Sequence, residues 1–172
     1  MIEIRIHGRG GMGAVTSSQI IALAAFYDGK YSQAFPMFGV ERGGAPVMAL
    51  ARIDEKTINI RSQVYEPDYV IVLESSLLNV VDVKKGLKKD LIVNTHKDLK
   101  GMKCIDGTSI AMRTIKKPFV NIIMVGAFAA FTNLLSLKSI LKAIDDKFKD
   151  KPELKELNKK AVTEIYNEIK NK

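Results

Sequence analysis

The sequence predicts an α/β fold, organised as a single three-layer α/β/α domain with a largely parallel, partly mixed sheet. Segments with the two-residue period of strands alternate along the chain with longer segments that have the period of helices. Two strand segments, 69–74 and 91–95, contain continuous apolar runs, which are typical of strands covered on both faces. With 172 residues, 47% of them hydrophobic, the chain suffices for one domain spanning 1–172, and two would be cramped.

The first half of the chain is predicted to form mainly strands. Residues 2–7 alternate isoleucine with polar residues, which is the pattern of a strand with one buried face. The pair 46–53 and 57–61, joined by a polar turn, predicts a hairpin and therefore an antiparallel portion of the sheet. We expect strands at 2–7, 31–35, 46–53, 57–61, 69–74, 91–95 and 103–105, and helices at 14–28, 76–88, 108–114, 120–132, 136–148 and 153–170.

Three of these helices end the chain. The apolar run 122–131 is too short to span a bilayer, which takes about 20 residues, and it indicates a buried helix. Ser136 is suited to cap the next helix, and Pro152 suits the first position of the last one. The helix at 153–170 carries a single apolar stripe, which predicts that it packs on the rest of the domain.

The net charge of +8 is unevenly distributed. Residues 1–83 hold 7 of the 27 Lys and Arg and 9 of the 19 Asp and Glu, which leaves 20 and 10 for residues 84–172. The excess is mostly lysine with few aromatic residues, whereas a nucleic-acid site favours a basic stripe with arginines and aromatics. We therefore expect a lysine-rich solvated surface and no nucleic-acid partner.

The chain lacks the usual signatures of an independent enzyme. Its one cysteine, Cys104, rules out an internal disulfide, a four-cysteine zinc site and an iron–sulfur cluster held by this chain alone. No secretory leader or membrane-spanning run is apparent, so we expect a cytoplasmic protein with no membrane partner. No Ser-His-Asp set, metal-ligand cluster or Walker A sequence is present, and we predict neither catalytic residues nor a metal site.

A glycine-rich turn between the first strand and the first helix is the best candidate for a ligand site. Gly8, Gly10 and Gly13 satisfy the pattern G-x-G-x-x-G directly after strand 2–7 and before helix 14–28. Glycines allow the backbone to approach a ligand, and the N–H groups and dipole of the helix favour an anion. Arg9 adds a charge suited to phosphate. The predicted binding residues are Gly8, Arg9, Gly10, Gly11, Met12 and Gly13.

Two other interpretations of this turn stay open. The first is a tight turn with close packing of helix on strand and no ligand. The second is a dinucleotide site, which also needs an acid near the end of the second strand, about 20 residues further on. The nearest acid, Asp28, lies in the turn before that strand. Phosphate binding is therefore favoured over a full NAD site.

A second constellation lies at 34–47, where apolar side chains alternate with glycines and prolines around one charged pair. These apolar groups either fill the domain's own core or form a surface that packs on another chain. In the latter case an arginine here is a candidate ligand or interface residue. The candidates for interface or ligand contact are Phe35, Phe38, Glu41 and Arg42.

Taken together, several ordered motifs resemble the gamma subunit of 2-oxoacid:ferredoxin oxidoreductases, in the branch that acts on pyruvate and 2-oxoisovalerate. Two positions depart from the pattern: Met12 stands where members commonly have glutamine, and Gly43 where they commonly have a second arginine. The resemblance covers nearly the whole chain and rests on 8–15, 33–42, 44–47, 61–68 and 132–135.

The resemblance implies a role in a larger complex. Such complexes decarboxylate a 2-oxoacid on thiamine diphosphate, pass electrons through [4Fe–4S] clusters to ferredoxin, and leave the acyl group on coenzyme A. Thiamine diphosphate and the clusters belong to the alpha, beta and delta subunits, which would be this chain's partners. The gamma domain is associated with coenzyme A. We therefore expect the turn at 8–13, with Arg9, to bind coenzyme A phosphates, and 34–47 to help form the subunit interface.

Three alternatives remain at this point. The complex could act on 2-oxoisovalerate in place of pyruvate, because the 2-oxoacid side chain is expected to be recognised by other subunits. The chain could be a purely structural assembly subunit. It could also be an independent nucleotide-dependent oxidoreductase, although the acid or arginine required on the second strand is not found.

Overall fold

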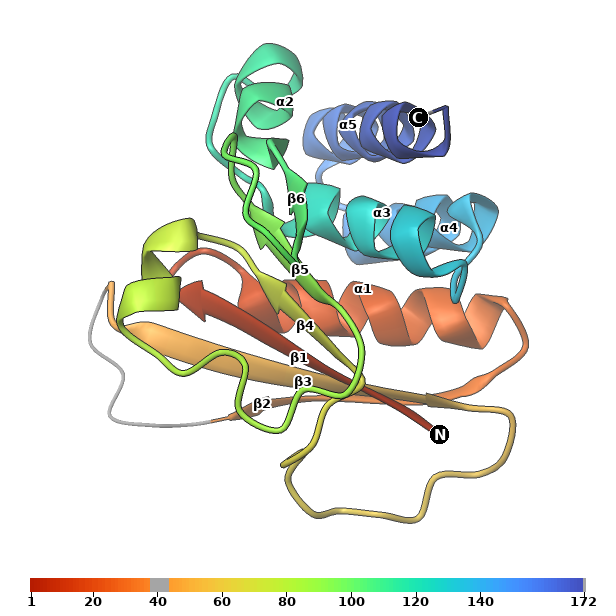
Figure 1. The fold of residues 1–172 in the computed structure, drawn as a ribbon. Coiled ribbons are helices and arrows are strands. Elements are labelled where there is room, and N and C mark those ends of the chain that lie inside the picture. Colours follow the sequence, from red (N-terminus) through yellow and green to blue (C-terminus); the bar gives the residue numbers. More distant parts are fainter. Residues whose placement is uncertain (38–43, 172) are drawn as a thin grey trace.

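The computed structural model describes residues 1–37 and 44–171, and its centre is a six-stranded sheet with the strand order β2-β3-β1-β4-β5-β6 (Figure 1). The strands are β1 (Ile2–Arg9), β2 (Tyr31–Met37), β3 (Pro46–Asp54), β4 (Tyr69–Val72), β5 (Leu91–Asn94) and β6 (Lys103–Ile105). The helices are α1 (Ala14–Tyr27), the 3-10 helix η1 (Ser75–Asn79), α2 (Gly107–Thr114), α3 (Asn121–Thr132), α4 (Leu137–Lys147) and α5 (Pro152–Lys170).

The sheet is mixed, as predicted. Parallel ladders join β1 to β4, β4 to β5 and β5 to β6, whereas β3 runs antiparallel to both β1 and β2. The α/β class with a largely parallel, partly mixed sheet is therefore confirmed. Because β1, β4, β5 and β6 are parallel, their carboxyl ends all lie at one edge of the sheet, called the carboxyl edge below. This is where ligands bind in open α/β sheets.

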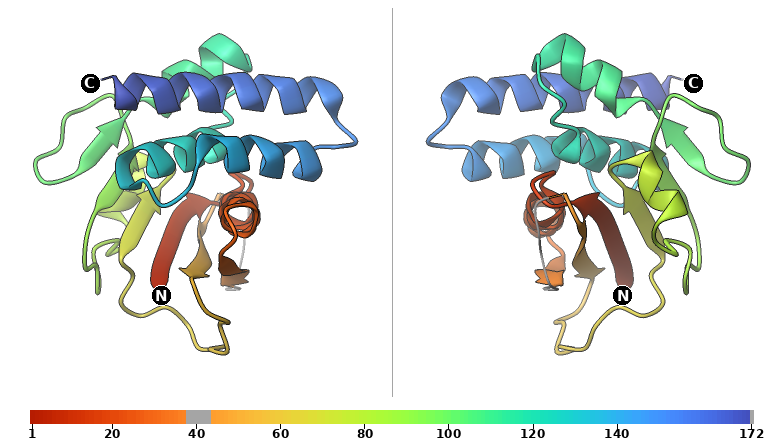
Figure 2. Two further views of the ribbon diagram at one scale, coloured as in Figure 1. Left: turned by 90° about the vertical axis from the view of Figure 1, so that its right-hand side faces the viewer. Right: turned by 90° about the vertical axis from the view of Figure 1, so that its left-hand side faces the viewer.

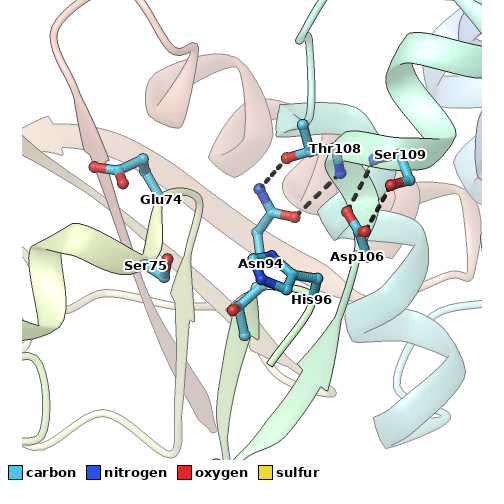
Figure 3. Close-up of a pocket in the computed structure, with 8 residues that line it drawn as sticks. Glu74, Ser75, Asn94, His96, Asp106, Thr108 and Ser109 are labelled. Carbon is cyan, nitrogen blue, oxygen red and sulfur yellow. Dashed lines mark hydrogen bonds between the residues drawn. The ribbon is translucent and has the colours of Figure 1, made fainter. Parts of the chain in front are cut away.

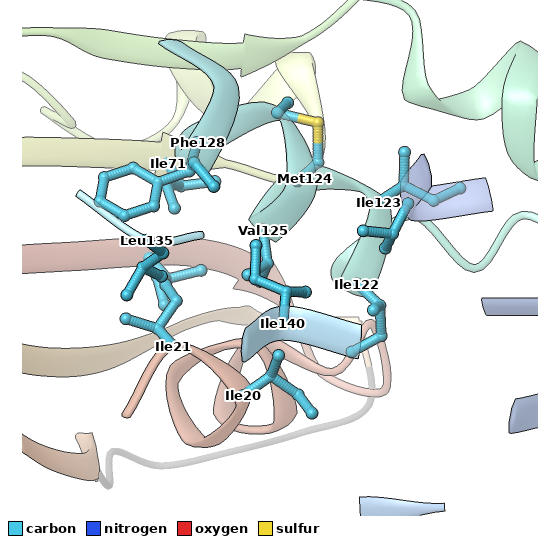
Figure 4. Close-up of a cluster of buried hydrophobic side chains, with 14 of the residues drawn as sticks. Ile20, Ile21, Ile71, Ile122, Ile123, Met124, Val125, Phe128, Leu135 and Ile140 are labelled. Atoms are coloured by element: carbon cyan, nitrogen blue, oxygen red, sulfur yellow. The ribbon is translucent and has the colours of Figure 1, made fainter. Parts of the chain in front are cut away.

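All five α-helices contribute to the apolar core on one face of the sheet. Figure 4 shows its centre, where side chains of α3 meet side chains of α1, α4 and β4. Nine consecutive residues of α3 are buried, from Ile122 to Ala130, so the predicted buried helix is confirmed. Helix α5 packs outside α3, as both views of Figure 2 show. Gly126 permits this approach, because a Cβ at that position would lie 3.0 Å from Ile165 Cγ2.

The second face of the sheet has a thinner cover. There η1 and the chain that follows it bury a smaller apolar cluster, which includes Val70, Val72 and Leu77. The prediction of a helix over 76–88 is wrong, because only Ser75–Asn79 is helical. Beyond Asn79, the carbonyls of Val83 and Lys85 accept hydrogen bonds from the guanidinium of Arg5 in β1. Gly86 has φ +71°, and a Cβ there would lie 2.3 Å from the carbonyl oxygen of Tyr65, so the chain turns sharply.

The predicted hairpin of 46–53 with 57–61 is also wrong. Strand β3 pairs with β1 and β2, and 57–61 is not a strand. The carbonyl of Ile58 accepts a hydrogen bond from the amide of Gln33, and that of Ile60 accepts one from the guanidinium of Arg52. Side chains of β2 and β3 thus satisfy this segment's backbone, so it covers the sheet without joining it.

None of the helices in 1–37 and 44–171 is both long and apolar enough to cross a membrane.

Candidate functional site

The glycine-rich turn at 8–13 lies at the carboxyl edge, between β1 and α1. Gly11 has φ +90° and Gly13, at the N-cap of α1, has φ +80°, so both adopt conformations that favour glycine. The turn is fixed by two backbone bonds, from Gly10 N to Ala45 O at 2.9 Å and from Met12 N to Arg9 O at 2.9 Å. The predicted geometry of strand, glycine turn and helix is therefore present.

The glycines of the turn meet different surroundings. A Cβ on Gly8 would approach Leu73 Cδ1 at 3.2 Å, and one on Gly13 would lie 2.5 Å from Asn121 Nδ2. At Gly11, in the described part of the chain, no atom lies within 4 Å of the corresponding position. Gly8 and Gly13 thus permit close packing, whereas Gly11 faces open space.

A cavity of about 280 Å³ opens at this turn. The first turn of α1 holds no acidic residue, and its N-cap is a glycine, so no side chain caps the helix or offsets its dipole from that position. An anion entering the cavity would therefore meet backbone N–H groups and the positive end of α1. The lining residues are Arg9, Gly10, Gly11, Gly13, Ala14, Val15, Val47 and Met48.

Arg9 is not a free cation but a clamp between three segments. Its Nε donates to Glu74 Oε2 at 2.9 Å, Nη1 to Gly44 O at 3.1 Å and Nη2 to Ser76 Oγ at 2.7 Å. Burial raises the pKa of Glu74, but hydrogen bonds from Ser76 and Arg9 lower it overall below its usual value. Glu74 is thus ionised at neutral pH and offsets much of the arginine's charge. A phosphate contact by Arg9 stays a prediction.

A second, polar cavity of about 280 Å³ lies further along the carboxyl edge, where β4, β5 and β6 end (Figure 3). The buried Asn94 lies near its centre and donates to Leu73 O at 2.9 Å and to Thr108 Oγ1 at 3.0 Å. Glu74 lines this cavity and also binds Arg9, so it joins the two cavities. No sequence motif predicts this group of residues, and its signal in the sequence is only that polar residues follow three strands. The lining residues are Glu74, Ser75, Asn94, Thr95, His96, Asp106, Thr108 and Ser109.

The residues predicted at 34–47 are only partly placed. Phe35 lies in β2, with the guanidinium of Arg52 5.3 Å from its ring centre, and it does not line the cavity at the glycine turn. Phe38, Glu41 and Arg42 lie outside the described residues. Where the chain is described again, Gly44 and Ala45 bond to Arg9 and Gly10. This end of the segment therefore supports the glycine turn directly.

The buried His7, in the strand that leads into the glycine turn, makes the stability of the fold depend on pH. It is 6% exposed, and burial first, then Arg5, lower its pKa from 6.5 to about 4. The folded state favours the neutral imidazole. The contribution of His7 to the free energy of unfolding is therefore fully present above pH 6.5 and is lost as the pH falls towards 4. The loss amounts to about 3 kcal/mol over that window. Urea unfolding at pH 7 and pH 4.5 should show a smaller difference for His7→Met than for the wild type, and equal differences would contradict this.

Comparison with known proteins shows which family the chain belongs to. The chain folds as an α/β domain with a mixed sheet, and its glycine turn and the adjoining cavity lie at the carboxyl edge of that sheet. A family model described as pyruvate ferredoxin/flavodoxin oxidoreductase matches residues 3–168, and the chain belongs to this family. The resemblance inferred from the motifs is thereby confirmed.

Relatives match over nearly their whole length. Pyruvate synthase subunit PorC of Methanocaldococcus jannaschii is 57% identical, over 100% of this chain and 99% of the relative. The pyruvate/ketoisovalerate oxidoreductases common subunit gamma of Pyrococcus abyssi is 51% identical, over 96% of each chain. The crystal structure of pyruvate oxidoreductase subunit PORC from Thermotoga maritima superposes with a TM-score of 0.82 at 37% identity, covering 96% of this chain and 95% of that one.

Proposed function

We propose that the chain is the gamma subunit of a pyruvate:ferredoxin oxidoreductase, a pyruvate synthase. The complex would decarboxylate a 2-oxoacid oxidatively, transfer the acyl group to coenzyme A and pass electrons to ferredoxin. The observation that carries this proposal is the 57% identity, over the full chain, to a pyruvate synthase subunit. The chain belongs to an oxidoreductase family, and the redox centres of the complex would lie in other subunits.

The donor groups of the chain support this division of labour. Among the described residues, no three His, Cys, Asp or Glu side chains are grouped so as to hold a metal ion. The sequence has a single cysteine, whereas a [4Fe–4S] cluster takes four cysteine ligands. Thiamine diphosphate and the clusters would accordingly belong to alpha, beta and delta partner subunits.

The contribution we propose for this chain is binding of coenzyme A phosphates at the glycine turn, together with subunit assembly. Phosphate groups are anionic acceptors, and the turn offers an uncapped helix N-terminus beside a cavity. The carbonyl oxygens of Gly44 and Arg9 are already used within the turn, so they do not face the ligand unpaired. Arg9 would act chiefly by fixing the shape of the site, because Glu74 offsets its charge.

Isolation of the native complex through a tag on this chain tests the function. We expect alpha, beta and delta subunits to co-purify, with coenzyme A-dependent reduction of ferredoxin by pyruvate. The relatives named for both pyruvate and ketoisovalerate favour 2-oxoisovalerate as a second substrate, which the same assay measures. A chain that purifies alone and binds NAD(P)H would instead support the independent oxidoreductase. Strand β2 ends in Phe35, Pro36 and Met37, without the acid which that alternative requires.

Arg9→Ala should weaken coenzyme A binding by the assembled complex roughly three- to tenfold, because the clamp that holds the turn is lost. Isothermal titration calorimetry measures this Kd directly. Arg113→Ala is the matched control, since Arg113 also pairs with a glutamate, Glu164, but on α2 and α5. Equal Kd values for wild type, Arg9→Ala and Arg113→Ala would remove Arg9 from the site.

A further inference from the structure

The N-terminus of α3 is seated directly on the glycine turn. Asn121, the first residue of α3, lies with Nδ2 3.5 Å from Gly13 O. The carbonyl oxygen of Asn121 accepts a hydrogen bond from Ser17 Oγ at 3.0 Å. Ser17 is 1% exposed, and its N donates to Gly13 O at 2.9 Å. The carbonyl of Gly13, at the N-cap of α1, is thus shared by groups from two helices.

The fit between Asn121 and the turn leaves no spare room. A Cβ on Gly13 would lie 2.5 Å from Asn121 Nδ2 and 3.0 Å from its Cγ, so amide and turn are in contact. Gly13 has φ +80°, a conformation that a glycine leaves easily for others unless its surroundings hold it. The contact with Asn121 restricts that freedom and so fixes the direction in which α1 begins.

We propose that Asn121 is a positioning residue for the anion site. By holding Gly13, it would keep the N–H groups of the first turn of α1 aimed at the cavity, with Ser17 anchoring the two helix ends together. This inference rests on the proposed binding of coenzyme A at the turn. It also assigns a role to the second half of the chain, because Asn121 lies 108 residues from Gly13 in sequence.

A positioning role for Asn121 and a simple packing role in the contact of α3 with α1 predict different effects on coenzyme A binding. A packing role would change the thermal stability of the complex and leave its affinity for coenzyme A unaltered. A positioning role raises the Kd for coenzyme A, because a misdirected turn must be reordered when the anion binds. It leaves the KM for the 2-oxoacid unchanged, since the proposed function assigns recognition of that substrate to other subunits.

The test compares variants of the assembled complex by calorimetry with coenzyme A. Asn121→Ala should raise the Kd roughly three- to tenfold, because the amide that packs on Gly13 and its long hydrogen bond are lost together, and Asn121→Asp should raise it further. In the aspartate variant, a carboxylate oxygen would face the Gly13 carbonyl near the anion. Asn158→Ala is the matched control, because the amide of this buried asparagine also bonds to a backbone carbonyl, that of Leu154, but within α5.

Three results decide the outcome. Higher Kd values for both Asn121 variants, with an unchanged Kd for Asn158→Ala and an unchanged KM for the 2-oxoacid, support the inference. A lower melting temperature with an unchanged Kd overturns it, while the proposed function stands if Gly11→Asp still weakens binding. If neither the Asn121 variants nor Gly11→Asp changes the Kd, coenzyme A does not bind at the turn, and both this inference and the proposed binding role of the turn fail.

Discussion

Arg52→Ala is expected to lower the free energy of unfolding by about 3–5 kcal/mol, the usual cost of breaking a buried ion pair. Arg52 in β3 is 1% exposed, and its Nε donates to Glu3 Oε1 at 2.9 Å. Its Nη2 donates to Ser62 O at 2.7 Å, which ties the segment after β3 to the sheet. The substitution therefore leaves the largely buried Glu3 carboxylate and several carbonyls without this donor, and opens space against the ring of Phe35.

Urea unfolding at pH 7 measures this loss. Arg113→Ala is the control, because this arginine is exposed and its pair with Glu164 is screened by water. The midpoint of the control should stay close to that of the wild type. Equal urea midpoints for Arg52→Ala and Arg113→Ala would contradict this prediction. They would show that Arg52 is not needed to hold the segment after β3 on the sheet.

The elements that could be predicted from the sequence are those whose pattern is local. Alternation in 2–7 and the continuous apolar runs of β4 and β5 identify three neighbouring strands, and the apolar stretch of α3 identifies the central helix. The helix expected over 76–88 ends at Asn79, and the carbonyls of Val83 and Lys85 accept hydrogen bonds from Arg5, 78 and 80 positions away. A local sequence pattern cannot predict a hydrogen-bond donor that lies so far away in the sequence.

In the candidate site, too, the sequence predicts the features with a local pattern and misses those that depend on distant residues. The spacing of Gly8, Gly10 and Gly13 is a local signal, and the turn forms as the spacing predicts. The partners of Arg9 lie 35, 65 and 67 residues away, at Gly44, Glu74 and Ser76, so its role as a clamp is visible only in the fold. The polar cavity at the ends of β4, β5 and β6 depends likewise on which strands become neighbours.

Gly11→Asp is expected to have the largest effect on the proposed activity. Gly11 lines the cavity, and in the described part of the chain nothing lies within 4 Å of an added Cβ, so a larger side chain fits without a clash. A carboxylate placed there would repel a phosphate about 5 Å away by on the order of 1–2 kcal/mol, since such a surface site is only partly screened by water. That corresponds to roughly a tenfold loss of affinity.

Two control variants separate charge from backbone strain. Gly11→Asn has nearly the same shape as Gly11→Asp and the same strain at φ +90°, but carries no charge. Gly101→Asp places the same charge at another open glycine with positive φ, φ +75°, in the turn before β6. Gly101→Asp should leave coenzyme A binding unchanged.

The most direct test of coenzyme A binding at the glycine turn is a calorimetric titration of coenzyme A into the assembled complex carrying Gly11→Asp or Gly11→Asn. A Kd about tenfold higher for the aspartate variant than for the asparagine variant is the predicted result. Equal Kd values for the two variants would contradict it and would leave this chain as a structural assembly subunit.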